Sequence, residues 1–333
     1  MSKYRSLLSY AVPLVVSLSI CVTVVRQVRT VALSSNDNYK AFYSFSGDVE
    51  GYTSIRQEWR ARVLSNFLAG RLANLIDTVY EPRDIDAAMF YLPSAWTVGW
   101  LIATFLLLVL AFRERSLFFI LGIYAGISFA YTPEMGMTRL MPWDMPALFS
   151  FTCFVIMIEK GRGRWVALLV PLATLFKETA LLLSLSFLFQ GDVRIRRRLA
   201  WFAGSLVAGF ALKGIADVIT QNPSPLFTMT VGDAPGAIRI LDNIHELFST
   251  RMDHPILADA GLVLSILILP PVNARIRMLK TIGVAFVLGN LTFGMIAEYR
   301  IWFEIIPLSL YALFLYFPSG APDRKRFPAQ RET

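Results

Sequence analysis

Long runs of apolar residues without charges constrain the fold of this chain more than any other sequence feature. Several runs extend for about 17–24 residues between charged clusters, long enough to cross a hydrocarbon layer about 30 Å thick. Hydrophobic residues make up 55% of the chain and charged residues only 17%, whereas soluble domains carry about 25% charged residues. This pattern excludes a soluble enzyme, a disordered chain and a disulfide-rich scaffold. It predicts an all-α, polytopic transmembrane helical bundle.

The apolar runs give the predicted membrane spans. The first, residues 7–25, is predicted to be a retained helix, because it is longer than the apolar core of a usual signal peptide. The later spans are predicted at 89–112, 116–131, 145–158, 199–219, 256–272, 281–297 and 301–317.

The stretch 165–189 requires a separate explanation, because basic residues flank it on both sides. Arg162 and Arg164 precede it and four arginines between 194 and 198 follow it, so the positive-inside rule places both ends in the cytoplasm. Residues 165–189 are too few for two full crossings at about 1.5 Å per residue. The sequence therefore predicts a short broken hairpin of two half-helices that turn at residues 176–179. One ordinary crossing with unusual flanks is the alternative.

The hairpin raises the prediction to about ten membrane segments, with both termini cytoplasmic. Residues 1–318 are expected to form a single transmembrane domain, followed by a basic cytoplasmic tail at 319–333. Two long outer loops are predicted, at 34–88 and 220–255, and loops of this length usually carry function or their own structure. Most carboxylates fall on the outer side of this map or within the bilayer, which points to chemistry on the outside.

The first outer loop contains a predicted interfacial helix. Its apolar residues recur at steps of three and four between 55 and 76, while charged and amide side chains occupy the other face. Arg62 lies on this polar face and could hold a lipid phosphate with its planar guanidinium group. The alternative is simple attraction of the helix to anionic lipid.

Further candidate site residues lie at predicted outer ends of the spans. Asp37 opens the first outer loop, where a carboxylate could act as a general base or stabilise a turn. Arg139 and Asp144 lie in an outer turn, and Asp144 precedes Met145-Pro146, so it could cap the next helix.

Two more groups of ionisable residues interrupt apolar sequence. Lys177 and Glu178 stand at the predicted hairpin tip, and charges at such a depth usually face a cavity or a partner. Arg300 and Glu304 stand at the outer start of the last span, four residues apart, and could pair with each other on one helical face.

The sequence contains no standard metal or nucleotide motif. His245 and His254 are the only histidines, and their spacing matches no zinc pattern. Both cysteines, Cys21 and Cys153, lie inside apolar runs. Walker, GxSxG and dinucleotide motifs are absent, and the positive charge of +8 is explained by cytoplasmic loops rather than nucleic acid.

Three of these segments together resemble the GT-C superfamily of integral-membrane glycosyltransferases. They are Asn36-Asp37-Asn38-Tyr39 before an interfacial helix, Lys177-Glu178-Thr179 at a broken hairpin, and the run from Glu298 to Pro307. The resemblance covers most of the chain and is to a short bacterial type without a C-terminal outer domain.

The resemblance implies a polyprenyl-phosphate-linked sugar as donor and a glycan, lipid or protein as acceptor. It makes Asp37 the catalytic base and places Arg62, Lys177 and Arg300 near the donor phosphate, with Arg139, Asp144, Glu178 and Glu304 as further substrate-binding residues. It implies a location in a bacterial inner membrane and a role in the cell envelope. It assigns no cofactor and leaves a divalent metal ion open.

Two other functions fit the composition. A polysaccharide polymerase or ligase using lipid-linked sugars would depend on the second outer loop, with Arg239, His245, Arg251 and His254. A lipid or solute transporter would favour internal repeats and sites at the membrane midplane, and the sequence shows no repeat.

Overall fold

The computed structural model describes residues 62–79, 85–112, 120–124, 143–191, 193–219, 240–248, 265–293 and 303–316. Within these ranges the chain is helical and has no strands, which confirms the all-α prediction for the described part. The α-helices are α5 (Val63–Val79), α6 (Ile85–Ala111), α8 (Asp144–Glu159), α9 (Val166–Thr174), α10 (Ile195–Ile219), α11 (Ile240–Phe248), α13 (Ala274–Phe293) and α14 (Ile306–Tyr316). The 3₁₀ helices are η2 (Gly163–Trp165), η3 (Glu178–Phe189) and η5 (Phe303–Ile305).

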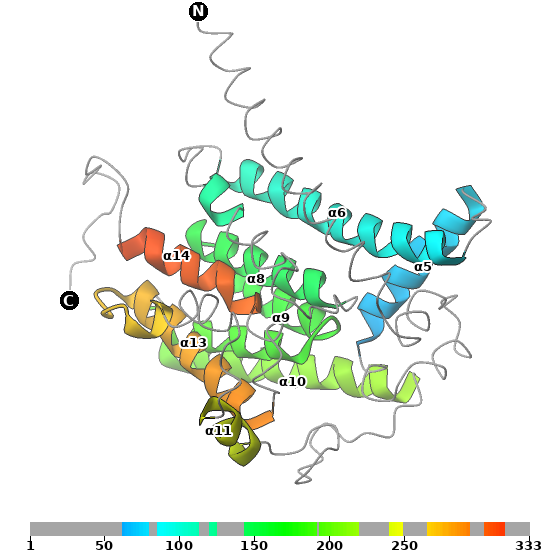
Figure 1. The fold of residues 1–333 in the computed structure, drawn as a ribbon. Helices are drawn as coiled ribbons and strands as arrows, with labels where there is room; N and C mark the ends of the chain where they lie inside the picture. The colour runs from blue at the N-terminus through cyan, green and yellow to red at the C-terminus, as the bar shows by residue number, and fades with distance from the viewer. Residues whose placement is uncertain are drawn as a thin grey trace, which may run out of the picture.

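Helix α8 lies at the centre of the packing. It contacts α6 on one side and α9 on the other, and α9 in turn packs against α10, so that Figure 1 shows these four helices in succession. Helix α14 and the 3₁₀ segment η3 also contact α8. Ten of its sixteen residues are buried. The two ends of α8 are therefore fixed relative to most of the described helices.

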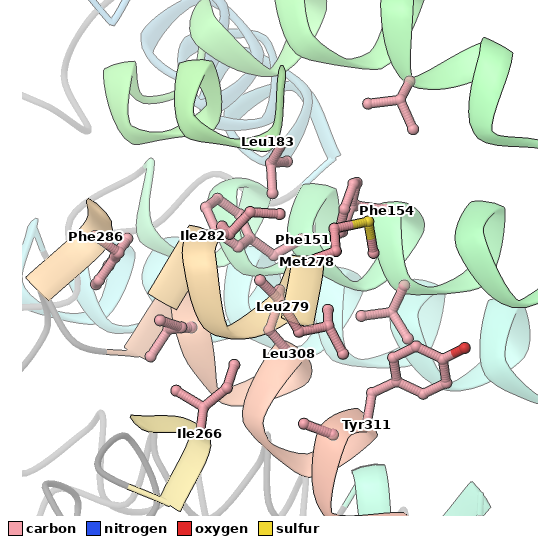
Figure 2. Packing of buried hydrophobic residues seen from close by; sticks show 14 of the residues in the cluster. Phe151, Phe154, Leu183, Ile266, Met278, Leu279, Ile282, Phe286, Leu308 and Tyr311 are labelled. Carbon is pink, nitrogen blue, oxygen red and sulfur yellow. The ribbon is translucent and has the colours of Figure 1, made fainter. Parts of the chain in front are cut away.

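The main apolar core joins α8 to η3, α13 and α14. Figure 2 shows Phe151 and Phe154 of α8 beside Ile282 of α13 and Leu308 of α14, and none of these four side chains is exposed. Aromatic rings also meet here, since Phe151 and Phe286 pack edge to face with centroids 6.2 Å apart. Close packing of this kind holds the late helices α13 and α14 against the middle of the chain.

Residues 163–190 form the predicted hairpin. Helix α9 ends at Thr174, and Lys177 has an extended backbone (φ −158°, ψ 138°) before η3 begins at Glu178. The two ends meet, because a Cβ atom on Gly163 would lie 2.7 Å from Nε2 of Gln190. The chain therefore forms two short helices with a break at residues 175–177, and how they lie in a membrane stays a prediction.

Arg198 closes the open end of this hairpin. Its guanidinium group donates hydrogen bonds to the carbonyl oxygens of Val193 (2.5 Å), Gly191 (3.0 Å) and Leu188 (3.4 Å). These carbonyls lie at and beyond the C-terminal end of η3, where a positive charge is favourable. One of the four arginines used for the topology prediction therefore has a structural role as well.

The described helices coincide with several predicted spans, but the number of membrane crossings stays a prediction. By length and composition, one helix in the described ranges, α10, could cross a membrane. Helices α6, α8, α13 and α14 overlap the predicted spans 89–112, 145–158, 281–297 and 301–317. Helix α13 begins earlier than predicted, at Ala274, and so includes three basic residues in its first two turns.

Candidate functional site

A buried charge cluster surrounds Lys177 at the tip of the hairpin. The Lys177 ammonium group forms ion pairs with Glu304 and with Oδ1 of Asp144, the latter at 3.5 Å. The Thr179 hydroxyl donates a hydrogen bond to the second carboxylate oxygen of Glu304. The side chains of Lys177, Asp144 and Glu304 are 7%, 2% and 1% exposed. We call Asp144, Lys177, Thr179 and Glu304 the buried cluster.

Three separate elements supply the buried cluster. Asp144 is the first residue of α8, Lys177 and Thr179 flank the start of η3, and Glu304 lies in η5 before the last helix. The prediction that Asp144 caps α8 is wrong, because Trp143 occupies the N-cap position and no side-chain cap bond forms there. A carboxylate in the first turn is nevertheless favoured by the helix dipole.

A second group of charges lies beside the first and is more exposed. Glu178 is held from both sides, with its Oε2 3.4 Å from Nε of Arg62 and its Oε1 3.2 Å from Nζ of Lys213. Lys213 also pairs with Oδ1 of Asp217, one turn further along α10, at 3.7 Å. The Glu178 and Arg62 side chains are 35% and 19% exposed. We call Arg62, Glu178, Lys213 and Asp217 the rim cluster.

The Arg62 side chain joins the two clusters. Its guanidinium carbon lies 4.3 Å from the ring centroid of Trp143, the residue before Asp144. The N–H of Leu64 donates a hydrogen bond to the carbonyl oxygen of Leu175 (3.3 Å), which ties the start of α5 to the hairpin turn. An indole ring both attracts a guanidinium group and fixes the orientation of its plane. Arg62 therefore presents its N–H donors in a fixed direction.

The structure thus brings five of the predicted site residues into one linked network. They are Arg62, Asp144, Lys177, Glu178 and Glu304. Asp37, Arg139 and Arg300 lie outside the described residues, as do Arg239, Arg251 and His254. Of the second outer loop, His245 is described and is exposed on α11, where its neighbour Asn243 anchors the helix to α13 through the carbonyl of Leu291 (2.8 Å).

Sequence reasoning missed Lys213, Asp217 and Trp143 as parts of this network. Lys213 and Asp217 lie inside the span predicted at 199–219, which was treated as a plain membrane helix. Ionisable residues in an apolar helix normally face a partner, and spacing of four residues places both on one face. That spacing was a usable signal. The position of Trp143 under Arg62 has no such signal, since the two residues are far apart in the chain.

The two clusters have different chemical capacity. The buried cluster is nearly closed to solvent, and loss of one partner from such a group leaves an uncompensated charge. The rim cluster places two cations, Arg62 just before α5 and Lys213 of α10, around a carboxylate that is 35% exposed. Among the described residues no three His, Cys, Asp or Glu side chains are placed to hold a metal ion.

Comparison of the chain with protein-family models, with curated proteins and with solved structures gives no match. The functional argument therefore depends on the geometry of the buried cluster and the rim cluster.

Proposed function

We propose that this protein is a membrane-embedded glycosyltransferase that moves a sugar from a polyprenyl-phosphate donor to an acceptor on the extracytoplasmic face. The observation that carries the proposal is the rim cluster, in which Arg62 and Lys213 converge on Glu178 at the tip of a broken apolar hairpin. This is the arrangement expected where a charged headgroup meets a membrane-embedded site.

A membrane environment is supported by apolar side chains on the outside of the described helices. Ile102, Leu106 and Leu110 are exposed at one face of α6, and Val207 and Val218 of α10 are exposed by 67% and 78%. Ridges of large apolar side chains in contact with water would be unfavourable, so they mark contact with lipid or with a protein partner. Lipid contact agrees with the apolar composition of α10.

The proposed reaction explains why cations are needed at this site. The bond between the anomeric carbon of the sugar and the phosphate oxygen breaks, and the leaving phosphate gains negative charge. Arg62 and Lys213 would stabilise that charge from two directions in a site of low dielectric. The acceptor hydroxyl forms the new bond to the anomeric carbon and gives its proton to a carboxylate, for which we propose Asp37.

The buried cluster has a positioning role in this proposal. The Lys177 ammonium group is enclosed by two carboxylates that are 2% and 1% exposed, so it has little capacity to bind a donor phosphate. Lys213 differs because its partner Glu178 is 35% exposed. Instead, Lys177 fixes the turn of the hairpin against α8 and η5. Glu178 follows Lys177 directly, so its position between the two cations depends on this anchor. The assignment of Lys177 to the donor phosphate is accordingly replaced by a role in holding the rim cluster in place.

A binding and transfer experiment tests the proposal. The full chain is reconstituted in lipid nanodiscs, and binding and turnover of a polyprenyl-phosphate sugar are measured for the wild type and for Arg62→Gln/Lys213→Met. The double variant should lose donor binding, while the control His245→Ala, an exposed residue of the second outer loop, should keep it. Unchanged donor binding in the double variant contradicts the proposal. So does turnover of a soluble nucleotide sugar without polyprenyl phosphate.

A further inference from the structure

The end of the hairpin opposite Lys177 and Glu178 is strongly basic. Three described segments meet there: residues 159–164 from the end of α8, residues 190–191 and 193–198 around the start of α10, and residues 273–277 at the start of α13. The first two are in contact, because Gly163 lies against Gln190. The first and third are joined by an ion pair between Nη1 of Arg275 and Oε2 of Glu159, at 3.1 Å. The three segments therefore form one continuous surface, which we call the basic end.

Positive charge at the basic end exceeds the negative charge available to neutralise it. The exposed cations there are Lys160, Arg162, Arg164, Arg194, Arg196, Arg197 and Arg277. Among the described residues of the three segments, Glu159 is the one carboxylate, and its Oε2 already accepts hydrogen bonds from Arg275 (3.1 Å) and from the Tyr311 hydroxyl (2.7 Å). The exposed cations therefore present an uncompensated field to an anionic ligand.

Apolar side chains adjoin this charge directly. On α9 and the residue before it, Trp165, Leu168 and Leu172 are exposed by 47%, 58% and 55%, at steps of three and four residues that place them on one face. Ile195 and Leu199, in the first turns of α10, are exposed by 59% and 49%. Helices α9 and α10 pack against each other, so both sets of side chains border the same region.

We propose that the basic end binds an anionic phospholipid. Charge complementarity selects the occupant: the phosphate of the headgroup contacts arginines such as Arg164, Arg196 and Arg197. One acyl chain lies along Trp165, Leu168 and Leu172, with the indole ring between the charged and apolar parts of the lipid. This site is at the far end of the hairpin from the rim cluster and does not depend on the proposed transferase function.

The surroundings of the basic end are fixed, which distinguishes a site from a diffuse attraction to a charged membrane. Arg198, in the first turn of α10, binds three carbonyl groups at and beyond the end of η3. Glu159 links α8 to α13 and α14 through Arg275 and Tyr311. The cations of the three segments are consequently presented in a constant arrangement. We expect the headgroup and the acyl chain to be recognised together.

Binding to the full-length protein in a neutral detergent tests this proposal. The dissociation constants of dioctanoyl phosphatidylglycerol and dioctanoyl phosphatidylcholine are compared for the wild type, for Arg164→Gln/Arg196→Gln/Arg197→Gln, and for Trp165→Ala. Phosphatidylglycerol should bind at least tenfold more tightly than phosphatidylcholine. Each neutralised arginine should weaken phosphatidylglycerol binding by about fivefold, and the triple variant by about 100-fold. Trp165→Ala should weaken the binding of both lipids.

The control variant is Arg71→Gln, which removes the same charge from an exposed position of α5. It should bind phosphatidylglycerol like the wild type. If the triple variant does not fold, lipid binding to the wild type is measured in 0.5 M NaCl instead. Because salt screens the charges, phosphatidylglycerol binding should weaken and phosphatidylcholine binding should stay unchanged. Equal affinity for the two lipids, or glycerol phosphate binding as tightly as phosphatidylglycerol, overturns the proposal.

Discussion

Lys177 and Glu178 are neighbours in the chain, yet each belongs to a different charge cluster. Lys177 points into the bundle and pairs with Asp144 and Glu304, whereas Glu178 pairs with Arg62 and Lys213 at the rim. The extended backbone at Lys177 explains this division, because successive side chains on an extended segment point to opposite sides. One short turn of the hairpin thus anchors the bundle and also supplies the central residue of the candidate site.

Removal of the Lys177 charge should strongly destabilise the protein. Lys177→Met removes the cation that pairs with the buried carboxylates of Asp144 and Glu304, and loss of one partner from a buried pair costs about 3–5 kcal/mol. The free energy of unfolding, measured by denaturation in detergent, should fall by that amount. Lys213→Met is the matched control at a similarly buried lysine, and it should cost less because its partner Glu178 is 35% exposed and keeps Arg62 as a second cation. An equal loss of stability in both variants would contradict the distinction between the clusters.

Arg62→Lys should weaken donor binding without unfolding the chain. Lysine keeps the charge but loses the planar stacking on Trp143, which is worth about 0.5–2 kcal/mol, or about 2–30-fold in affinity. Titration of the reconstituted protein with a polyprenyl-phosphate sugar measures the change. Trp143→Leu should produce a similar loss, because it removes the ring that orients Arg62. Wild-type affinity in both variants would show that the stacked geometry has no role in binding.

Asp37→Asn should separate turnover from binding. The amide keeps the shape of the carboxylate but cannot accept a proton, so turnover should fall by about 10²–10⁴-fold while donor affinity is retained. Arg300→Lys, in comparison, should weaken donor binding as well as turnover, because lysine lacks the fork that holds phosphate. Rates and affinities measured on the same preparations provide the comparison. Full activity of well-folded Asp37→Asn would refute the proposed mechanism.

Gly209→Val should destabilise the contact between α10 and the hairpin. A Cβ atom on Gly209 would lie 2.5 Å from Cδ2 of Leu181 and 3.3 Å from Oγ1 of Thr174, so the larger side chain must displace these two side chains. Overpacking of this kind costs about 1–3 kcal/mol. Gly204→Val is the control on the same helix, because a Cβ there meets no atom within 4 Å. Thermal melting of the two variants should differ clearly. Equal melting temperatures would contradict the close approach.

Because the chain turns back at the hairpin tip, the two ends of the hairpin should face the same side of the membrane. In a chain with Cys21 and Cys153 replaced by serine, single cysteines at Arg164 and at Gly191 should both react with an impermeant thiol reagent from the cytoplasmic side. Arg164 is exposed, and a side chain at Gly191 meets no atom within 4 Å, so neither change should disturb the turn. Labelling of the two positions from opposite sides would rule out the two-half-helix arrangement in the membrane.

Much of the helical pattern could be predicted because it depends on the apolar runs themselves. Basic flanks at both ends of 165–189, together with its short length, indicated a turn near Lys177, and the described hairpin has its break there. Ionisable residues in apolar surroundings were also reliable markers, since Lys177, Glu178 and Glu304 all join the network. Such residues need partners, and the need is visible in the sequence even where the partner is not.

Partners were harder to predict because pairing depends on how helices pack. Glu304 is bound by Lys177 and Thr179 from the hairpin, and nothing in the sequence around Glu304 indicates these two partners. Lys213 was overlooked because one lysine hardly changes the average hydropathy of α10. The prediction that Asp144 caps α8 is wrong for a local reason. A capping residue precedes the helix, whereas Asp144 is already the first residue of α8.

The winding of η3 determines how far the hairpin tip reaches. Twelve residues in a 3₁₀ helix extend about 24 Å, whereas the same residues in an α-helix would extend about 18 Å. This segment is therefore stretched by about one α-helical turn, and the difference places Glu178 within reach of Arg62 and Lys213. Rewinding of η3 into an α-helix would draw Glu178 away from both cations, so the backbone geometry of the apolar residues that follow Glu178 sets where the charges meet.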